Sequence, residues 1–269
     1  MYNVYIIGAG NKGALSDAPG SGNEHKYLSY AHAVKDHPAF KLVGFGDILP
    51  EMRIEAERIW NPENSNTIDV VVITTPDNSH YDYLKGIADC GFGLVICEKP
   101  LCDNVEQAKE IVELYKKNNV PLLVDYTRRF IPEFRNHRNN IIQGNYGNFI
   151  KGYLYFNRGW EHTASHFVDM CLWFNGSMDN IEITEIKTDY QWVYQWALFY
   201  EKDFVSEHAV NFVKEKVPSK YDRHLYLVMD NVYQYLERNS DYLFCTGEDG
   251  LRAIIETERI KNEYSINRR

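Results

Sequence analysis

Residues 2–13, YNVYIIGAGNKG, decide the fold of this chain. The apolar run YNVYII predicts a buried strand, and GAGNKG follows it immediately. The first glycine permits a tight turn, the second lets backbone approach a pyrophosphate, and the third permits close packing of the next element. Such a turn after a strand predicts a dinucleotide site. The predicted phosphate-binding residues are Gly8, Gly10, Asn11, Lys12 and Gly13.

Strand and helix patterns alternate through the first half of the chain. Strands are expected over residues 2–8, 41–47, 69–74, 94–97 and 121–125. Helices are expected over residues 27–36, 51–60, 79–90 and 105–118. This alternation predicts an α/β fold with a doubly wound parallel sheet and right-handed crossovers, a Rossmann domain over residues 1–127.

The pattern changes in the second half, residues 128–269, which we expect to form an α+β domain with a mostly antiparallel sheet. Strands are expected over residues 148–156, 182–193, 196–200 and 208–214. Helices are expected over residues 132–143, 162–174, 221–238 and 248–262.

Composition narrows the class of protein. The 269 residues carry a net charge of −9, which argues against a nucleic acid as partner. No apolar run approaches the roughly 18 residues of a membrane span, and the chain enters a strand directly, without a signal peptide. The five cysteines lack CxxC spacing and predict reduced, packed thiols of a cytoplasmic protein.

Asp47 ends the second predicted strand, in GFGD. An acid at this place accepts hydrogen bonds from ribose hydroxyls and repels a 2′-phosphate, which favours NAD over NADP, although Arg53 lies nearby in sequence. Asp47 lies further from the glycines than the usual spacing of about 20 residues. Residues 14–26 therefore form an insertion. It is either an inert surface loop or a flap that brings Ser21, Asn23, His25 or Lys26 near the ligand.

Lys99 follows the apolar strand LVIC in the segment CEKP, residues 97–100. Pro100 ends the strand because it cannot donate a ladder hydrogen bond. The carboxyl ends of parallel strands are where open α/β sheets bind their ligands. Lys99 is therefore expected at the mouth of the dinucleotide site rather than in an ordinary surface turn.

Five motifs, taken in order, resemble the Gfo/Idh/MocA family of glucose–fructose oxidoreductases and inositol dehydrogenases. The resemblance covers about the first two-thirds of the chain. It implies a Rossmann domain followed by a mostly antiparallel open sheet, shortened here, that binds substrate and joins subunits into a homodimer or homotetramer. The motifs are GAGNKG, TTPDNSH (74–80), CEKP (97–100), DYTRRFIPEF (125–134) and HTASHFVDMCLWFNG (162–176).

The resemblance also implies roles for single residues. Lys99 matches a lysine that contacts the nicotinamide ribose and the substrate, and His166 matches the histidine that acts as acid and base. His162 stands where the family often has an aspartate, a departure that affects the proton relay. The remaining matched residues are Thr75, Pro76, His80 and Glu98 for the cofactor, and Arg128, Arg129 and Asp169 for the substrate side.

Alcohol oxidation by NAD needs a base for the hydroxyl proton, which suits His166, and a positive charge beside the developing alkoxide, which suits Lys99. On a helix, His162, His166 and Asp169 share one face. That face could also be structural, or a zinc site, because His-x-x-x-His is ligand spacing. Thr163 replaces the glutamate of a zinc protease, however, and no metal is predicted.

Two tryptophans flank this predicted helix. Trp173 lies in an apolar run and is expected in the core. Trp160 is either packing or a stacking surface for a sugar ring, and we include it among the candidate substrate residues.

The resulting hypothesis is an NAD-dependent oxidoreductase that acts on CH–OH. It would move a hydride between nicotinamide and a secondary hydroxyl or keto group of a sugar, nucleotide-linked sugar or cyclitol. The substrate class comes from the resemblance alone. The main alternative is a non-catalytic dinucleotide sensor of the same fold. Reduction of an imine or double bond, and an internal cycle in which NAD never leaves, also stay open.

Overall fold

A computed structural model describes residues 1–156, 159–178, 194–200, 223–240 and 242–263. The chain divides into two compact units. The first unit contains residues 1–130 and 220–251, and the second contains residues 131–219 and 252–269. The predicted boundary after residue 127 lies close to the first crossing between the units. The return of residues 220–251 to the first unit was not predicted.

The first unit is built on a five-stranded parallel sheet, as the alternating pattern predicts. Its order is β2-β1-β3-β4-β5, so the winding reverses between β1 and β3. Open sheets of this kind bind ligands in the crevice at such a switch point, outside the carboxyl ends of the strands. The strands are β1 (Tyr2–Ile7), β2 (Phe40–Gly46), β3 (Val70–Ile73), β4 (Leu94–Glu98) and β5 (Leu122–Asp125).

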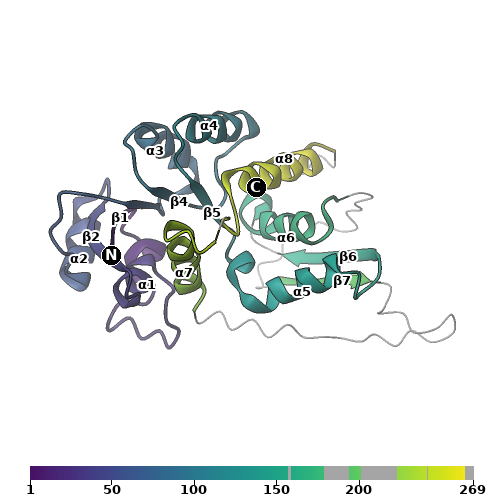
Figure 1. Ribbon diagram of the computed structural model, residues 1–269, viewed down its shortest axis with the longest axis horizontal. Coiled ribbons are helices and arrows are strands. Elements are labelled where there is room, and N and C mark those ends of the chain that lie inside the picture. The colour runs from purple at the N-terminus through teal and green to yellow at the C-terminus, as the bar shows by residue number, and fades with distance from the viewer. Residues whose placement is uncertain (157–158, 179–193, 201–222, 241, 264–269) are drawn as a thin grey trace. The chain divides into compact units, whose positions relative to one another are not determined.

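Helices cover both faces of this sheet, with α3 and α4 on one face and α1 and α7 on the other (Figure 1). All four residues of β3 are buried, as are the first four of β4, which a doubly covered sheet requires. The helices are α1 (Tyr30–Asp36), α2 (Pro50–Trp60), α3 (His80–Ile87), α4 (Val105–Lys117) and α7 (His224–Leu236), with short turns η1 (Asn11–Leu15), η2 (Asp77–Ser79) and η3 (Thr127–Phe130).

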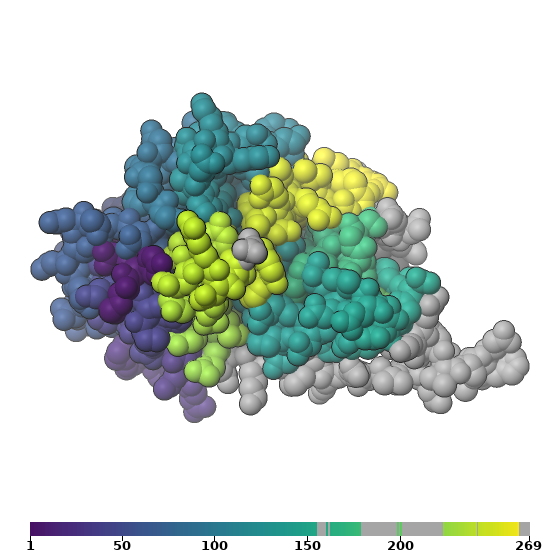
Figure 2. Space-filling view, in the orientation of Figure 1, coloured from purple at the N-terminus to yellow at the C-terminus, as the bar shows by residue number. Residues whose placement is uncertain are grey.

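Helix α7 explains why the predicted domain boundary is incomplete. It packs against α1, and its buried face includes Leu225, Val228 and Met229. Figure 2 shows its surface beside the N-terminal residues, and the Tyr2 hydroxyl donates a hydrogen bond to Glu237 Oε1 at 3.1 Å. The following segment forms an antiparallel bridge to β5 through Thr246. A C-terminal stretch therefore completes the first unit.

The second unit holds an antiparallel pair, β6 (Phe149–Phe156) and β7 (Tyr194–Tyr200), with helix α5 (Pro132–Ile142). The turn η4 (Gly159–Ala164) leads into α6 (Ser165–Asn175), and α8 (Gly247–Glu263) begins in the first unit and ends in the second. The strands predicted over residues 182–193 and 208–214 lie outside the described residues.

Apolar side chains of α5 and α6 form the core of the second unit. Ile131, Phe134, Met170 and Phe174 are buried together, and Trp173 packs against them, which confirms it as a core residue. Within the described residues, none of the helices combines the length and apolar character needed to cross a bilayer. Within the described residues none of the five cysteines forms a disulfide; Cys90 is exposed and the other four are buried.

Candidate active site

The glycine turn leaves no room for side chains at its first and last glycines. Gly8 has φ +100°, and a Cβ on it would lie 2.7 Å from the backbone carbon of Thr74. A Cβ on Gly13 would overlap the carbonyl oxygen of Gly8. The Thr74 hydroxyl donates to that same oxygen at 2.7 Å. The turn is thus locked between the ends of β1 and β3, at the switch point of the sheet.

Gly10 differs from these two glycines. A Cβ built on Gly10 would meet no atom within 4 Å, so this position borders open space. A glycine there lets an anion approach the backbone closely, as the pyrophosphate of a dinucleotide does. The turn therefore fits the group that its sequence predicts. The π-helical turn η1 continues from Asn11, in place of a direct entry into an α-helix.

Asp47, at the end of β2, is joined to the glycine turn. Its Oδ2 accepts a hydrogen bond from the backbone N–H of Ala9 at 2.7 Å, and its Oδ1 accepts from the N–H of Leu49 at 2.9 Å. The carboxylate is oriented by two backbone donors, while its remaining lone pairs can accept from hydroxyl groups. This is the arrangement expected of the predicted ribose ligand.

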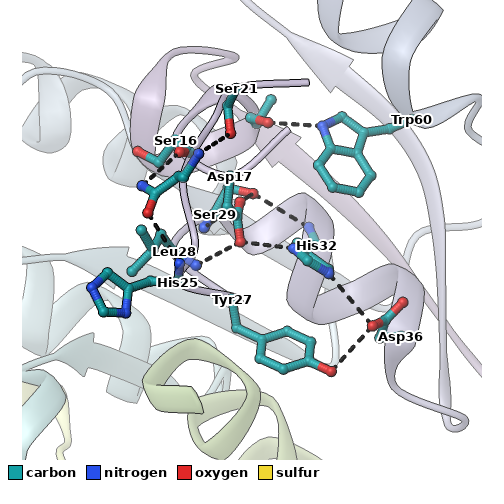
Figure 3. Close-up of polar contacts among 12 residues, drawn as sticks. Ser16, Asp17, Ser21, His25, Tyr27, Leu28, Ser29, His32, Asp36 and Trp60 are labelled. Carbon is teal, nitrogen blue, oxygen red and sulfur yellow. Dashed lines mark hydrogen bonds and ion pairs between the residues drawn. The ribbon is translucent and has the colours of Figure 1, made fainter. Parts of the chain in front are cut away.

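The insertion over residues 14–26 is anchored by Asp17, which sequence reasoning did not single out (Figure 3). The buried Asp17 carboxylate accepts from the N–H of Leu28 at 2.7 Å and from the hydroxyl of Ser29 at 2.5 Å. It also pairs with His32 Nδ1 at 2.7 Å. Residues 19–26 are exposed. The insertion therefore has a fixed base and an exposed tip that carries Ser21, Asn23, His25 and Lys26.

His80 connects the end of β3 to the segment after β4. The side chain is fully buried, with Nδ1 2.7 Å from the carbonyl oxygen of Pro100 and Nε2 3.0 Å from that of Thr75. The Ser79 hydroxyl donates to Thr75 Oγ1 at 2.8 Å. His80 is thus engaged by backbone on both sides, and it holds the Thr75–Pro76 segment beside Pro100 rather than presenting a free ring.

Four polar side chains meet at the ends of β4 and β5, which we call the strand-end cluster: Lys12, Tyr30, Glu98 and Asp125. Lys12 Nζ lies 3.2 Å from Glu98 Oε1 and 3.7 Å from Asp125 Oδ2. The Tyr30 hydroxyl donates to Asp125 Oδ2 at 2.9 Å. Sequence reasoning included Lys12 and Glu98 but did not list Tyr30 and Asp125 as site residues. Asp125 carried a usable signal, because it ends a predicted parallel strand and opens the motif DYTRRFIPEF, whereas nothing in the local pattern marks Tyr30.

The charged groups in and beside this cluster shift one another's pKa values. Burial, together with the charge of Asp125, raises the pKa of Glu98, although Lys12 opposes the shift. Burial also raises the pKa of Asp125, but Lys12 and the hydrogen bond from Glu98 reverse this and hold it below its usual value. Lys99 is 7% exposed, and burial, aided by Lys12, lowers its pKa. Perturbed groups at the carboxyl ends of parallel strands are typical of functional sites.

The two arginines after β5 are both buried, in turn η3. Arg129 Nη1 lies 3.0 Å from Asp249 Oδ1 and donates to the carbonyl of Phe244 at 3.4 Å. These contacts explain Arg129 as a structural residue that ties η3 to the start of α8. Arg128 is 9% exposed and stays the candidate for substrate binding.

The predicted helix 162–174 is divided in the structure. His162 lies in the π-helical turn η4, while His166 and Asp169 lie in α6. Asp169 is buried, His166 is partly buried and His162 is exposed. Because a π-turn holds more residues than an α-turn, the regular i, i+4 spacing assumed for His162 does not apply there. The pair His166 and Asp169 keeps its spacing on a regular helix.

Trp160 is a packing residue. Its indole Nε1 donates to the carbonyl oxygen of Thr257 at 2.9 Å, and the ring packs against Val168, Leu172 and Ile260. These contacts favour the packing alternative for Trp160, and its stacking on a sugar stays a prediction. Among the described residues, no group of three or more His, Cys, Asp or Glu side chains could hold a metal ion.

Comparison with known proteins shows what the first part of the chain resembles. Residues 2–126 match the family GFO_IDH_MocA, described as "Oxidoreductase family, NAD-binding Rossmann fold". The chain is 37% identical over 81 residues to the rhizopine catabolism protein MocA of Rhizobium meliloti, covering 30% of this chain and 25% of MocA. It is 32% identical over 141 residues to the scyllo-inositol 2-dehydrogenase (NAD(+)) of Bacillus subtilis strain 168, covering 47% of this chain and 41% of that protein.

Solved structures extend the likeness of fold beyond the matched segment. The WlbA dehydrogenase from Bordetella pertussis, in complex with NADH and UDP-GlcNAcA, has a TM-score of 0.72 and 16% identity. The match covers 98% of this chain and 96% of WlbA. The sequence matches to the two curated relatives span less than half of their length, so the likeness over the second unit is one of fold.

Proposed function

We propose that this chain, whose residues 2–126 match the Gfo/Idh/MocA oxidoreductase family with its NAD-binding Rossmann fold, belongs to that family and is an NAD-dependent oxidoreductase acting on CH–OH. The substrate class is a sugar, nucleotide-linked sugar or cyclitol. The observation that carries the proposal is the placement of a glycine turn, an acid and a buried lysine at the carboxyl ends of one parallel sheet. Inositol and nucleotide-sugar dehydrogenases among the relatives support the substrate class.

The glycine turn and Asp47 would hold the cofactor. Gly10 borders open space for the pyrophosphate, and Asp47 is oriented to accept from the ribose hydroxyls. A carboxylate there disfavours a 2′-phosphate, which supports NAD over NADP. NAD, when bound, supplies the hydride acceptor, and the protein supplies orientation and charge. Thr75 and Pro76, held by His80, would border the nicotinamide.

Lys99 would stabilise negative charge on the substrate oxygen. Its ammonium group is buried, so its charge acts through a medium of lower dielectric than water. Burial also lowers the pKa of Lys99, which makes its ammonium group a better proton donor than an exposed lysine. Lys99 is therefore suited both to stabilise a developing alkoxide and to lower the pKa of the alcohol.

His166 would take the hydroxyl proton, and Asp169 would orient it. A histidine changes charge near neutral pH, which suits a general base. The partly buried His166 and the buried Asp169 lie three residues apart on α6, in the second unit. Arg128 would bind substrate. The exposed His162 would bind a substrate hydroxyl or replace the family aspartate as a hydrogen-bond partner.

The assembly we propose is a cytoplasmic homodimer or homotetramer joined through the sheet of the second unit. Phe149, Ile150 and Tyr153 of β6 are exposed apolar residues, 41%, 47% and 43% accessible, which supports such a contact. Light scattering of the wild type and Tyr153→Glu tests it. A monomeric wild type would reject the proposed assembly without bearing on the chemistry.

A panel of sugars, nucleotide-linked sugars and cyclitols, assayed with NAD and with NADP, tests the function. We expect turnover with NAD and a loss of about 10²–10⁴-fold in kcat for Lys99→Ala and His166→Ala. Lys41→Met, an exposed lysine paired with Glu63 at 3.1 Å, is the control and should retain activity. Tight NADH binding without turnover on any member would contradict the enzyme and favour a dinucleotide sensor.

A further inference from the structure

Lys12 lies in the glycine turn after β1, yet its ammonium group pairs with carboxylates at the ends of two other strands, β4 and β5. Its Nζ is 3.2 Å from Glu98 Oε1 and 3.7 Å from Asp125 Oδ2. Glu98 and Asp125 are register partners across β4 and β5, so the two carboxylates are neighbours on the sheet. One lysine therefore joins the turn after β1 to the strands that end beside Lys99.

The acceptors of Lys12 are themselves fixed. Asp125 has no exposed surface, and its Oδ2 also accepts from the Tyr30 hydroxyl at 2.9 Å. Its Oδ1 accepts from the Thr127 hydroxyl at 3.0 Å. The Glu98 side chain is 13% exposed. Since the carboxylates cannot swing into water, the position of Lys12, and the turn that carries it, is coupled to the position of Glu98 and its neighbour Lys99.

We propose that Lys12 is a positioning residue: it fixes the glycine turn to the ends of β4 and β5 and sets the charge that surrounds Lys99. This inference rests on the proposed function, in which the turn holds the cofactor and Lys99 faces the substrate. Lys12 therefore acts through Glu98, Asp125 and Lys99 and does not itself need to touch either ligand.

Electrostatics support this geometry. The charge of Lys12 opposes the raised pKa of Glu98 and helps to hold the pKa of Asp125 below its usual value. The charge of Lys12 also helps burial to lower the pKa of Lys99. Removing the Lys12 charge would take away this repulsion and leave the opposing attraction of Glu98, Asp77 and Asp125, which raises the Lys99 pKa. The titratable groups that act on the cluster and on Lys99 are Tyr30, Asp77, Cys97, Glu98, Lys99, Asp125 and His224.

Competitive acetylation of the folded protein, followed by mass spectrometry, measures the titration of Lys99 without substrate or cofactor. We expect Lys12→Met to move the midpoint of Lys99 labelling upward by about one pH unit, which is about a tenfold change in its proton affinity. Lys12→Arg keeps the charge and should leave the midpoint near that of the wild type. Lys41→Met, which removes an exposed lysine from its pair with Glu63, is the matched control.

A charge-balanced double variant keeps the proposal testable if Lys12→Met does not fold. Lys12→Met/Asp125→Asn removes one cation and one anion, so its Lys99 midpoint should return toward the wild-type value. If the Lys99 midpoint in Lys12→Met lies within about 0.2 pH unit of the wild type, the proposal is overturned. It is also overturned if the Lys99 midpoint in the double variant shifts as far as in Lys12→Met. If Lys12→Met does not fold, a double variant shifted upward by about one unit overturns it.

Kinetics and cofactor binding then separate this proposal from the proposed function. In an active enzyme, Lys12→Met should weaken NADH binding and move the basic limb of the kcat/KM profile to higher pH. Wild-type protein that binds no NADH would reject the proposed function. The Lys99 labelling result would still decide the coupling between Lys12 and Lys99, because it needs no ligand.

Discussion

The carboxylate of Asp47 and the backbone of Ala9 are joined by a hydrogen bond of 2.7 Å from the Ala9 N–H to Asp47 Oδ2. This bond connects the end of β2 to the glycine turn after β1. Asp47 therefore has two separable properties: an acceptor oxygen that shapes the turn, and a negative charge that selects the cofactor.

Replacing Asp47 by asparagine separates these properties. The amide oxygen can still accept from Ala9, but the charge that repels a 2′-phosphate is gone. We expect the preference for NAD over NADP to fall by about 10–100-fold, roughly 1–3 kcal/mol. Titration of wild type and variant with NADH and NADPH measures it. Asp47→Ala should lose the preference and some stability as well, and an unchanged preference in both variants would remove Asp47 from the cofactor site.

Gly10 and Gly13 should respond differently to alanine. In Gly13→Ala, the new methyl group would overlap the Gly8 carbonyl oxygen, so we expect a loss of about 1–3 kcal/mol in unfolding free energy. Gly10→Ala meets open space and should fold with an unchanged Tm, but it should weaken NADH binding by about tenfold or more. Calorimetry and fluorescence titration give the two readouts. Tight NADH binding by Gly10→Ala would contradict the placement of the pyrophosphate.

The insertion of residues 14–26 has a structural base and a tip that can be tested alone. Asp17→Ala removes the buried acceptor of Leu28, Ser29 and His32, so we expect a destabilisation of about 3–5 kcal/mol. Deleting residues 16–23 would remove Asp17, so a loss of folding stability could not be separated from a loss of ligand binding. His25→Ala/Lys26→Ala changes only exposed tip side chains. If the tip covers the ligand, this variant should keep its Tm and raise KM or the NADH Kd severalfold, and unchanged constants would identify an inert loop.

Glu98 should make stability fall as pH rises. Burial raises its folded-state pKa to about 8, so the folded protein holds a proton that the unfolded chain releases near its ordinary value of about 4.3. The stabilising proton is fully present below the unfolded pKa and is lost as pH rises through the folded pKa. Denaturation between pH 4.5 and pH 8 should show this decline, and Glu98→Gln should flatten it. A parallel decline in the variant would assign the effect to other groups.

Substitutions of Trp160 test whether this residue serves packing or substrate binding. Trp160→Ala should cost about 3–5 kcal/mol, because the ring fills the space beside Val168, Leu172 and Ile260. Trp160→Phe keeps most of the contact and loses the hydrogen bond to Thr257, about 1 kcal/mol. We expect the KM of Trp160→Phe to match the wild type. A KM raised tenfold with little loss of stability would return Trp160 to the substrate site.

Local sequence determined the parallel sheet of the first unit. A strand pattern, a glycine turn and a charged strand end are signals within a few residues of one another, so YNVYIIGAGNKG and CEKP predict their own surroundings. Of the strand β1, predicted as buried, only Val4 and Ile6 are fully buried, whereas the first four residues of β4 all are. The strands of the parallel sheet lie within two residues of their predicted ends. Gly8, Asp47 and Lys99 each follow the carboxyl end of a strand as expected, because parallel strands align those ends at one edge.

Tertiary structure decided what local pattern cannot encode. The partners of Lys12 are Glu98 and Asp125, far along the chain, and sheet register alone makes those two carboxylates neighbours. Residues 220–251 return to the first unit because the apolar face of α7 packs on α1. No local sequence pattern predicts this return. Sequence periodicity reports which face of an element is apolar, whereas the choice of the element that covers it depends on long-range packing.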